Sequence, residues 1–352
     1  MEEEGVIPKL LTWYEINHRL LPWRETKNPY EIWVSEMILQ QTRVDQGLPY
    51  YKRFLDKFPQ ITDLAVAEEI EVLAVWQGLG YYARARNMHK AAKTICNERS
   101  GIFPDTFEEI KRLPGIGPYT AAAIASFAFK EKVPCVDGNV KRVVARWKGW
   151  SDDIGTARFF NLSFDFLETV IPGASPDVFN QAMMELGSLV CTPHSPNCRV
   201  CPLMETCEAA RLGKQSELPV KIKKTKVSKV QIHYLLLRNP DGEVAFTQRP
   251  SNGVWGGLYE LPSVEFPESK NTTARVNLFF ENLGIENKVL IANESHLLSH
   301  KKIEAFLWKV SDISVLEDLG LKIQWAEKEQ IKSFPKHKLM LKFVPYWDDK
   351  SS

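Results

Sequence analysis

Two carboxylates stand where their surroundings suit acid–base chemistry. Glu36 falls in a run predicted to be helical, 29–41, on the face that carries Trp33 and Met37. Apolar surroundings raise the pKa of a carboxyl group, which suits a general acid at neutral pH. Asp137 precedes a predicted helix, where an ionised carboxylate is stabilised and can face a developing cation. From the residues alone, Glu36 is equally a surface glutamate, whereas a plain helix cap is the more common use of an aspartate placed like Asp137.

A glycine-punctuated turn at 113–117 (LPGIG) opens into an alanine-rich run, 119–129, that is predicted to be a helix. Gly115 and Gly117 let the backbone bend and let a partner approach closely. The free N–H groups and the positive dipole end of the following helix suit a phosphate. The alternative is an ordinary packing corner between two helices.

Six cysteines are present, and four of them crowd into 191–207. In an intracellular chain such clustering favours a metal over disulfides. A zinc ribbon uses two C-x2-C pairs and only one occurs here, whereas uneven spacing and a proline after a cysteine are typical of an iron–sulfur loop. Cys96 and Cys135 are predicted to be buried thiols. The cluster ligands are predicted to be Cys191, Cys198, Cys201 and Cys207.

A second glycine-rich stretch, 76–86 (WQGLGYYARAR), contains two tyrosines and two arginines. Tyrosine rings can stack on bases and arginines can pair with phosphates. The alternative is that Tyr81 and Tyr82 are core residues at the start of a helix. Lys and Arg number 45 against 44 Asp and Glu, so overall charge does not indicate a nucleic-acid binder. Any grip on DNA must come from local placement and backbone donors.

The elements that must hold these residues divide the chain into two parts. At 352 residues the chain is long enough for two domains. A lysine-rich stretch, 216–229, is predicted to be a basic linker between a region at 1–215 and a domain at 230–352. Helical patterns at 8–21, 29–41, 50–58, 62–76, 119–129, 140–148 and 179–187 precede it, and strand-like runs at 231–238, 243–248, 302–308 and 321–325 follow it.

The start of the chain, MEEEGVIPKLL, is acidic and lacks the apolar segment of a secretion signal. No apolar run reaches the length that a membrane-spanning helix needs. We therefore expect a cytoplasmic protein that does not use a membrane.

The runs LPGIG at 113–117 and VDGNV at 136–140, in this order and spacing, resemble the helix-hairpin-helix DNA glycosylase superfamily, that of endonuclease III. The resemblance implies that Gly115 and Gly117 anchor DNA phosphates and that Asp137 lies at a nucleotide flipped out of the duplex. Bifunctional members carry a lysine two residues after the second hairpin glycine, where this chain has Tyr119. Because a Schiff-base lyase needs an amine, the resemblance implies a monofunctional glycosylase.

The segment 33–44 (WVSEMILQQTRV) is similar to the one that carries the catalytic glutamate of MutY-type adenine DNA glycosylases, and Glu36 falls on that residue. In that family GLGYYARAR lies against the DNA, so Tyr81 would be a wedge near the lesion. Gln41 and Thr42 would approach the opposite strand. The four clustered cysteines match the family's 4Fe–4S loop in order and spacing, which implies one such cluster.

Four further residues fall at positions with family roles. Tyr119 and Asn139 would orient the two carboxylates and the water. Arg24 and Glu185 would line the adenine pocket.

The last domain resembles the Nudix-like C-terminal domain of MutY proteins. A Nudix hydrolase needs an acidic magnesium-binding helix, and segment 274–284 offers little beyond Glu281, so no pyrophosphatase activity is expected. A Phe-Ser-His loop recognises 8-oxoguanine in the family. At the matching positions Ser299 and His300 keep the polar pair, but Leu298 offers no ring for stacking.

The predicted fold is therefore an all-α helix-hairpin-helix glycosylase region, with a six-helix module and an iron–sulfur module, followed by an α+β Nudix-like domain. The resemblance implies a monomeric base excision repair enzyme that removes adenine opposite 8-oxoguanine or guanine in double-stranded DNA. Glu36 would protonate the base at N7, and Asp137 would stabilise the oxocarbenium-like sugar or trap it covalently.

Three alternatives stand beside this reading: a glycosylase for thymine or oxidised pyrimidines, a non-catalytic DNA-damage sensor, and a Nudix-type nucleotide hydrolase. The second domain argues against the first alternative, because simple endonuclease III-like proteins lack it. The two carboxylates argue against a pure sensor, and the missing acidic helix argues against a Nudix hydrolase.

Overall fold

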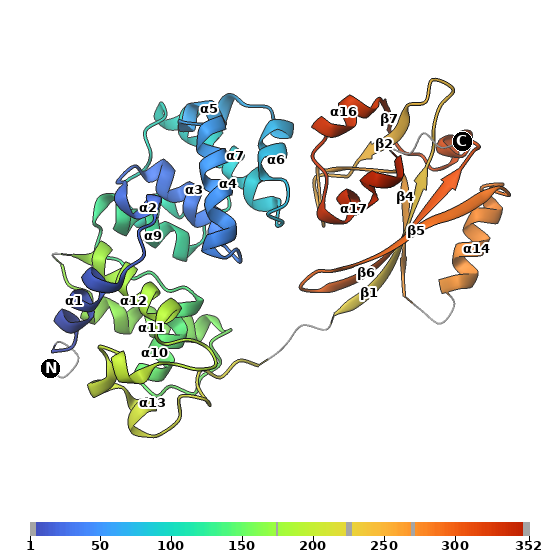
Figure 1. Cartoon of the computed structure of the whole chain (residues 1–352). Coiled ribbons are helices and arrows are strands. Elements are labelled where there is room, and N and C mark those ends of the chain that lie inside the picture. Colours follow the sequence, from blue (N-terminus) through green and yellow to red (C-terminus); the bar gives the residue numbers. More distant parts are fainter. Residues whose placement is uncertain (1–4, 174, 223–226, 269–271, 348–352) are drawn as a thin grey trace. The chain divides into compact units, whose positions relative to one another are not determined.

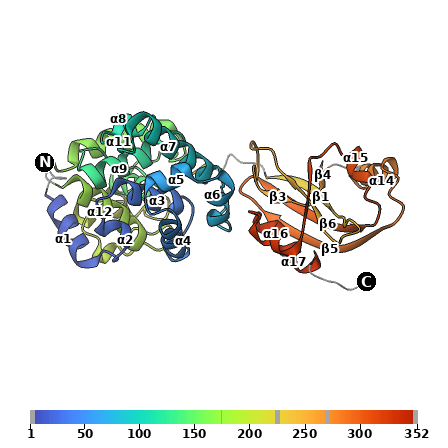
Figure 2. The same ribbon diagram turned by 90° about the horizontal axis from the view of Figure 1, so that it is seen from above.

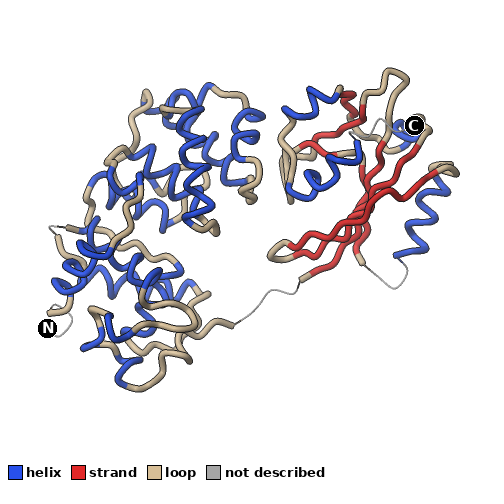
Figure 3. The backbone as a smooth tube through the Cα atoms, in the orientation of Figure 1, coloured by secondary structure: helices blue, strands red, loops and turns tan. Residues whose placement is uncertain are grey.

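The computed structural model describes residues 5–173, 175–222, 227–268 and 272–347. The chain forms two compact units, one of Met1–Val66 with Asn87–Lys223 and one of Ala67–Arg86 with Lys224–Ser352. Among the described residues, the first unit is helical and the strands belong to the second (Figure 3). This confirms the predicted fold class. The predicted domain boundaries at 215 and 230 stay a prediction, and linker residues 223–226 lie outside the described part.

The first unit is built from helices (Figure 1), and buried apolar side chains fill the space between them. α3 packs against α4 and α9, and α12 packs against α1, α9 and α10. The helices are α1 (Ile7–Asn17), α2 (Pro22–Glu25), α3 (Pro29–Leu39), α4 (Val44–Lys57), α5 (Ile61–Val66), α7 (Ala83–Arg99, which begins in the second unit), α8 (Phe107–Ile110), α9 (Pro118–Phe129), α10 (Gly138–Trp147), α11 (Ala157–Val170), α12 (Pro176–Leu189) and α13 (Glu208–Arg211).

The helix that carries Glu36 begins where its sequence predicts. The side chain of Asn28 accepts a hydrogen bond from the amide of Tyr30, and Pro29 occupies the first turn. Both features favour a helix start. From Tyr30 to Ile38 all positions but one are buried, so α3 is a central helix and not an amphipathic surface one.

The helical run predicted at 62–76 is wrong as a single element. It divides into α5 and α6 (Glu69–Trp76). Glu68 begins α6 with a reciprocal capping box. The Glu68 side chain accepts a hydrogen bond from the Glu71 amide, and the Glu71 side chain accepts one from the Glu68 amide. The new cap restarts the helix, and α6 groups with the second unit.

The second unit contains two sheets. One has the order β4-β1-β6-β5, with β1 and β6 parallel and the other neighbours antiparallel, and the other has the order β3-β2-β7. The strands are β1 (Ser228–Leu236), β2 (Val244–Gln248), β3 (Tyr259–Glu260), β4 (Ser263–Pro267), β5 (Lys288–Leu297), β6 (Lys301–Val310) and β7 (Ile323–Ala326). β1, β2, β6 and β7 confirm the four predicted runs to within three residues at each end.

Successive side chains of β1 point alternately into two apolar cores, one on each face of the strand. Tyr234 and Leu236 face a cluster with α17 (Lys338–Trp347), whereas Leu235 packs toward α14 (Thr272–Asn282). Successive side chains of a strand point to opposite faces, which is why one strand can serve both clusters. Figures 1 and 2 show α14 on one side of the sheet, and α16 (Lys328–Ser333) and α17 on the other.

Across the described stretches of the chain, no helix has the length and apolar character needed to cross a lipid bilayer.

Candidate active site

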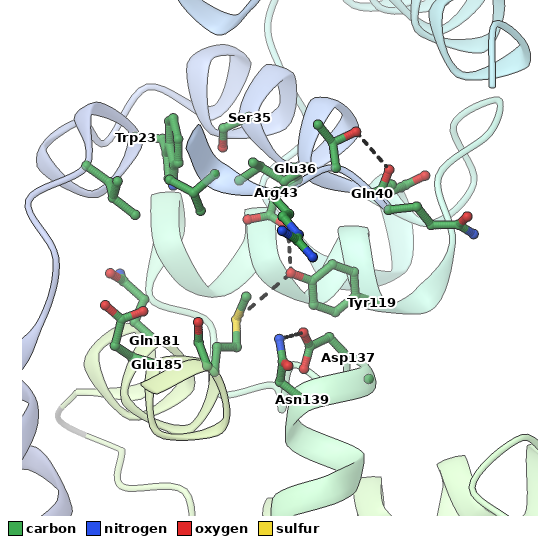
Figure 4. A pocket seen from close by; sticks show the side chains of 18 of the residues that line it. Trp23, Ser35, Glu36, Gln40, Arg43, Tyr119, Asp137, Asn139, Gln181 and Glu185 are labelled. Atoms are coloured by element: carbon green, nitrogen blue, oxygen red, sulfur yellow. Dashed lines mark hydrogen bonds between the residues drawn. The ribbon is translucent and has the colours of Figure 1, made fainter. Parts of the chain in front are cut away.

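A cavity of about 840 Å³ opens in the first unit, among residues of α2, α3, α9, α10 and α12. Figure 4 shows side chains from these separate helices directed into it. Residues that lie more than a hundred positions apart in the chain therefore share one space. The predicted site residues that line it are Arg24, Glu36, Gln41, Thr42, Tyr119, Asp137, Asn139 and Glu185.

Glu36 and Tyr119 form a short hydrogen bond inside the cavity. The Tyr119 hydroxyl donates a 2.6 Å hydrogen bond to Oε2 of Glu36 (Figure 4). The Glu36 residue is only 5% exposed. Burial raises the pKa of Glu36 to about 7, and the nearby Asp137 charge raises it too, against the lowering effect of the Tyr119 hydrogen bond. The carboxyl can therefore hold a proton at neutral pH and release it readily.

Asp137 caps α10 and faces the same cavity. One carboxylate oxygen accepts from the Val140 amide at 2.7 Å, and the other accepts from Nδ2 of Asn139 at 2.9 Å. Burial raises the pKa of Asp137, and these two hydrogen bonds oppose the rise. The two donors fix the orientation of the carboxylate at the helix start, where the dipole favours the ionised form.

Glu185 is held ionised by two arginines. Arg19 and Arg24 each donate to both of its oxygens, at 2.6–3.0 Å. Burial raises the pKa of Glu185, but the hydrogen bonds from Arg19 and Arg24 outweigh it and lower the pKa to about 2. One cavity thus holds a carboxylate that stays charged and a carboxyl that titrates near neutrality, a division typical of acid–base sites.

Arg19 and Gln181 line the cavity as well, and the sequence analysis missed both. On α12 the positions 181, 184, 185 and 188 all face the cavity. Their spacing of three and four residues marks one helix face, and this signal could have found Gln181. Arg19 follows the end of α1, and no local pattern predicts its partner 166 residues away.

The hairpin glycines lie outside this cavity, in the turn between α8 and α9. Gly115 has φ of +75°, and an added Cβ would come within 2.3 Å of the Asn87 side chain. Gly117 is exposed and has open space where a side chain would be. The first glycine is therefore required by the fold, whereas the second leaves the start of α9 open to a partner.

Tyr81 lies in the second unit, at the turn that follows α6. It is 51% exposed and adopts φ of +50°, in the left-handed region. The Arg84 guanidinium lies 5.6 Å from the centre of its ring. Tyr82, in contrast, is buried, and its hydroxyl donates to the Lys336 carbonyl at 3.2 Å. Tyr81 is therefore exposed, as a ring that contacts DNA must be, whereas Tyr82 is a core residue, as the alternative interpretation expected for both tyrosines.

Ser299 and His300 occupy the exposed turn between β5 and β6. The Ser299 hydroxyl and Nδ1 of His300 are 3.3 Å apart. The carbonyl of His300 accepts from the Ser228 amide, which ties the turn to the start of β1. Leu298 packs against the buried cluster of the unit, while Leu297 is 71% exposed.

The four clustered cysteines surround a second, small cavity in the first unit, and all of them are free thiols. Among the described residues, no three His, Cys, Asp or Glu side chains converge on the position of a single metal ion. A four-iron cluster needs a different arrangement, because each cysteine binds its own iron and the sulfurs stay apart. Nη1 of Arg146 lies 3.4 Å from the Cys191 sulfur, a buried cation that suits a thiolate-bound cluster. The residues present fit the cluster.

The two cysteines outside this group behave differently from each other. Cys135 is buried as predicted, whereas Cys96 is only half-buried, which corrects the prediction for that residue. Cys96 lies on α7 with its thiol directed at the Ile61 carbonyl, at the surface of the helical unit.

Known protein families match residues in both units. Residues 34–163 match the family described as HhH-GPD superfamily base excision DNA repair protein, and residues 233–345 match the NUDIX domain. An adenine DNA glycosylase of Buchnera aphidicola subsp. Baizongia pistaciae is 35% identical and aligns over 83% of this chain and 82% of its own length. One from Arabidopsis thaliana is 38% identical over 78% of this chain, which spans only half of that relative.

Solved structures resemble the helical part. A thermostable thymine-DNA glycosylase is 27% identical with a TM-score of 0.54, covering 60% of this chain and 98% of that chain. Endonuclease III in a trapped covalent DNA intermediate shares the fold, with 23% identity and a TM-score of 0.52 over 60% of this chain and 97% of that chain. Since the Buchnera relative exceeds 30% identity and is matched over most of its length, the chain belongs to the adenine DNA glycosylase family.

Proposed function

We propose that this protein removes adenine from double-stranded DNA where the base is mispaired with 8-oxoguanine or guanine, as a monofunctional glycosylase of base excision repair. The observation that carries the proposal is the hydrogen bond between Tyr119 and a buried Glu36 whose pKa is about 7. Family membership supports the same base, since the relatives are named adenine DNA glycosylases.

Glu36 is the proposed general acid. Adenine is a poor leaving group, and an enzyme that acts on it must take it out of the base stack. A carboxyl with a pKa near 7 is protonated in a large fraction of molecules at neutral pH and can give its proton to N7 of the purine. Tyr119 holds the carboxyl through the oxygen it contacts and thereby orients the other oxygen.

Asp137 is the proposed partner of the sugar. As the N-glycosidic bond breaks, positive charge develops on the ring, and a carboxylate held by Asn139 and the Val140 amide can stabilise that charge or trap the cation. Water then adds to the anomeric carbon, and the proton that it loses returns to the Glu36 carboxylate, which gave its own proton to the base. Arg24 and Glu185 form a fixed ion pair along the cavity wall that we assign to recognition of the base.

The remaining contacts with DNA are proposed from where each side chain lies and how exposed it is. The exposed start of α9 at Gly115 and Gly117 would receive a phosphate, and the half-exposed Tyr81 ring would enter the base stack. Gln41 and Thr42, at the cavity edge, would approach the opposite strand. In the second unit, Ser299 and His300 would contact 8-oxoguanine through polar groups that the exposed turn presents.

We propose that Cys191, Cys198, Cys201 and Cys207 hold one 4Fe–4S cluster. When bound, the cluster would brace the loop 191–207 and take no part in base removal. Arg146, buried beside Cys191, would offset the negative charge of the cluster.

A mispair panel tests the proposed function. Duplexes with adenine opposite 8-oxoguanine, guanine or thymine, and with thymine opposite guanine, are incubated in single-turnover conditions and split into samples with and without alkali. The expected result is free adenine from the first two duplexes and strand breaks only after alkali. Release of thymine, or breaks without alkali, would overturn the substrate or the monofunctional assignment.

A further inference from the structure

The segment that leaves the first unit runs beside the catalytic cavity. The Ile154 amide donates to the Val220 carbonyl at 3.0 Å, and the Ile222 amide donates to Oδ1 of Asp153 at 3.4 Å. The same Asp153 oxygen accepts from the Gly155 amide at 2.9 Å. The first two bonds fasten residues 220–222 to the loop 153–155, the third holds the loop itself, and the residue between the two anchors is Lys221.

This fastening brings Lys221 into the lining of the cavity. Lys221 lines the cavity together with Ile154 and Gly155 of the loop and with Asp137 of α10. The lysine is exposed. A long flexible side chain at such a place can reach over the opening while its backbone stays fixed.

Three other cations of the cavity, Arg19, Arg24 and Lys141, already have partners within the protein, whereas the guanidinium of Arg43, which also lines the cavity, has none among the described residues. Arg19 and Arg24 are bound to Glu185. The Lys141 ammonium donates to the Ile154 carbonyl at 3.2 Å. Within the described part of the chain, the ammonium of Lys221 forms neither an ion pair nor a hydrogen bond.

We propose that Lys221 binds a backbone phosphate of the target nucleotide once that nucleotide has left the base stack. The inference rests on the proposed function, because it takes the cavity to receive a flipped nucleotide. With the base at Glu36 and the sugar at Asp137, the two flanking phosphates lie toward the opening. A lysine binds phosphate as a point charge and needs no rigid geometry.

The positive charge of Lys221 would also reduce the repulsion between Asp137 and the DNA phosphates. Asp137 must approach the sugar of a polyanionic strand, and two like charges repel at short range. A cation at the opening offsets this repulsion without forming an ion pair that would neutralise Asp137. The segment that joins the two units thus contributes a binding residue to the catalytic cavity.

Salt dependence of binding tests the proposal. Affinity for an adenine:8-oxoguanine duplex is measured in a Glu36→Gln background, with Lys221→Met, Lys221→Arg and, as matched control, Lys214→Met. Lys214 is exposed in the same stretch but does not line the cavity. Losing one phosphate contact should lower the slope of log affinity against log salt by about 0.9, which is roughly tenfold weaker binding at 0.1 M salt. Arginine should restore the slope, and Lys214→Met should leave it unchanged.

Neutral phosphates locate the contact. Duplexes carry one methylphosphonate, either directly 5′ or directly 3′ of the target adenine. On one of the two, Lys221→Met should cause no further loss of affinity, because the charge it would meet is gone. An unchanged salt slope for Lys221→Met, or an equal loss on the native and on both neutral duplexes, would overturn the proposal. Binding in this inactive background is read independently of base release, so failure of the proposed function would appear separately, as absent adenine release by the unmodified protein.

Discussion

The hydroxyl of Tyr119 on α9 and the Oε2 oxygen of Glu36 on α3 lie 2.6 Å apart, although 83 residues separate them in the chain. α9 begins directly after the glycine hairpin, at Pro118. The turn that we propose to face a DNA phosphate therefore also sets the position of Tyr119, the group that contacts the proposed acid. In the proposed mechanism, α9 thus connects the phosphate-binding turn with the residue that orients the general acid.

The pH dependence of base removal should report the state of Glu36. Burial raises the pKa of this carboxyl to about 7, and the proposed acid acts only when protonated. The value of kcat/KM for adenine release should therefore be level well below pH 7 and fall toward tenfold per pH unit above it. A rate that stays constant from pH 6 to 9 would contradict the assignment.

Tyr119→Phe should move this pH profile. The Tyr119 hydrogen bond lowers the pKa of Glu36, so its removal should raise that pKa and shift the falling limb to higher pH. Measurement of kcat/KM against pH for the variant and the unmodified protein gives the comparison. A merely structural tyrosine would change the rate at all pH values and leave the limb where it was.

Substitutions can separate the observed capping role of Asp137 from its proposed catalytic role. Asn caps helices about as well as Asp, so Asp137→Asn should keep most of the stability of the fold while base release is lost. Asp137→Ala removes the bond to the Val140 amide as well and should lower the free energy of unfolding by about 1 kcal/mol. Urea unfolding and single-turnover adenine release are measured for both. Near-normal turnover by the asparagine variant would refute a catalytic role.

The cysteine cavity predicts the metal content of the purified protein. Chemical analysis should find about four irons and four sulfides per chain, the content of one cubane. Cys201→Ala should lower the iron content and the stability of the unit. Cys96→Ala is the matched control, because this half-buried thiol lies on α7, does not line the cysteine cavity and should leave the iron content unchanged. Equal iron in both variants would remove Cys201 from the ligand set.

Local signals predicted the elements that carry the proposed catalytic groups. Asn28 and Pro29 mark the start of α3, and Asp137 marks the start of α10, because caps and first-turn prolines act within a few residues. The carboxyl of Glu36 was predicted to sit among apolar groups, and the structure buries it. Its position beside Tyr119 followed only from the family resemblance, since no local pattern joins two helices.

Features that depend on distant partners escaped prediction. β5 has no alternating apolar pattern, with Ala292 its one buried residue among those described, and it forms by pairing with β6. The ion pairs of Arg19 and Glu185 join the end of α1 to α12. The break between α5 and α6 depends on a capping box made of two glutamates, whose helix-forming tendency hid the boundary.

The most direct test of the account is single-turnover release of adenine from an adenine:8-oxoguanine duplex by Glu36→Gln, with binding measured in parallel. Glutamine keeps the size and the hydrogen bond acceptor for Tyr119 but carries no acidic proton. The account predicts that release falls by at least about 10²–10⁴-fold, the usual contribution of a general acid, while affinity stays near that of the unmodified protein. Release at an unchanged rate would contradict the claim that Glu36 protonates the leaving base.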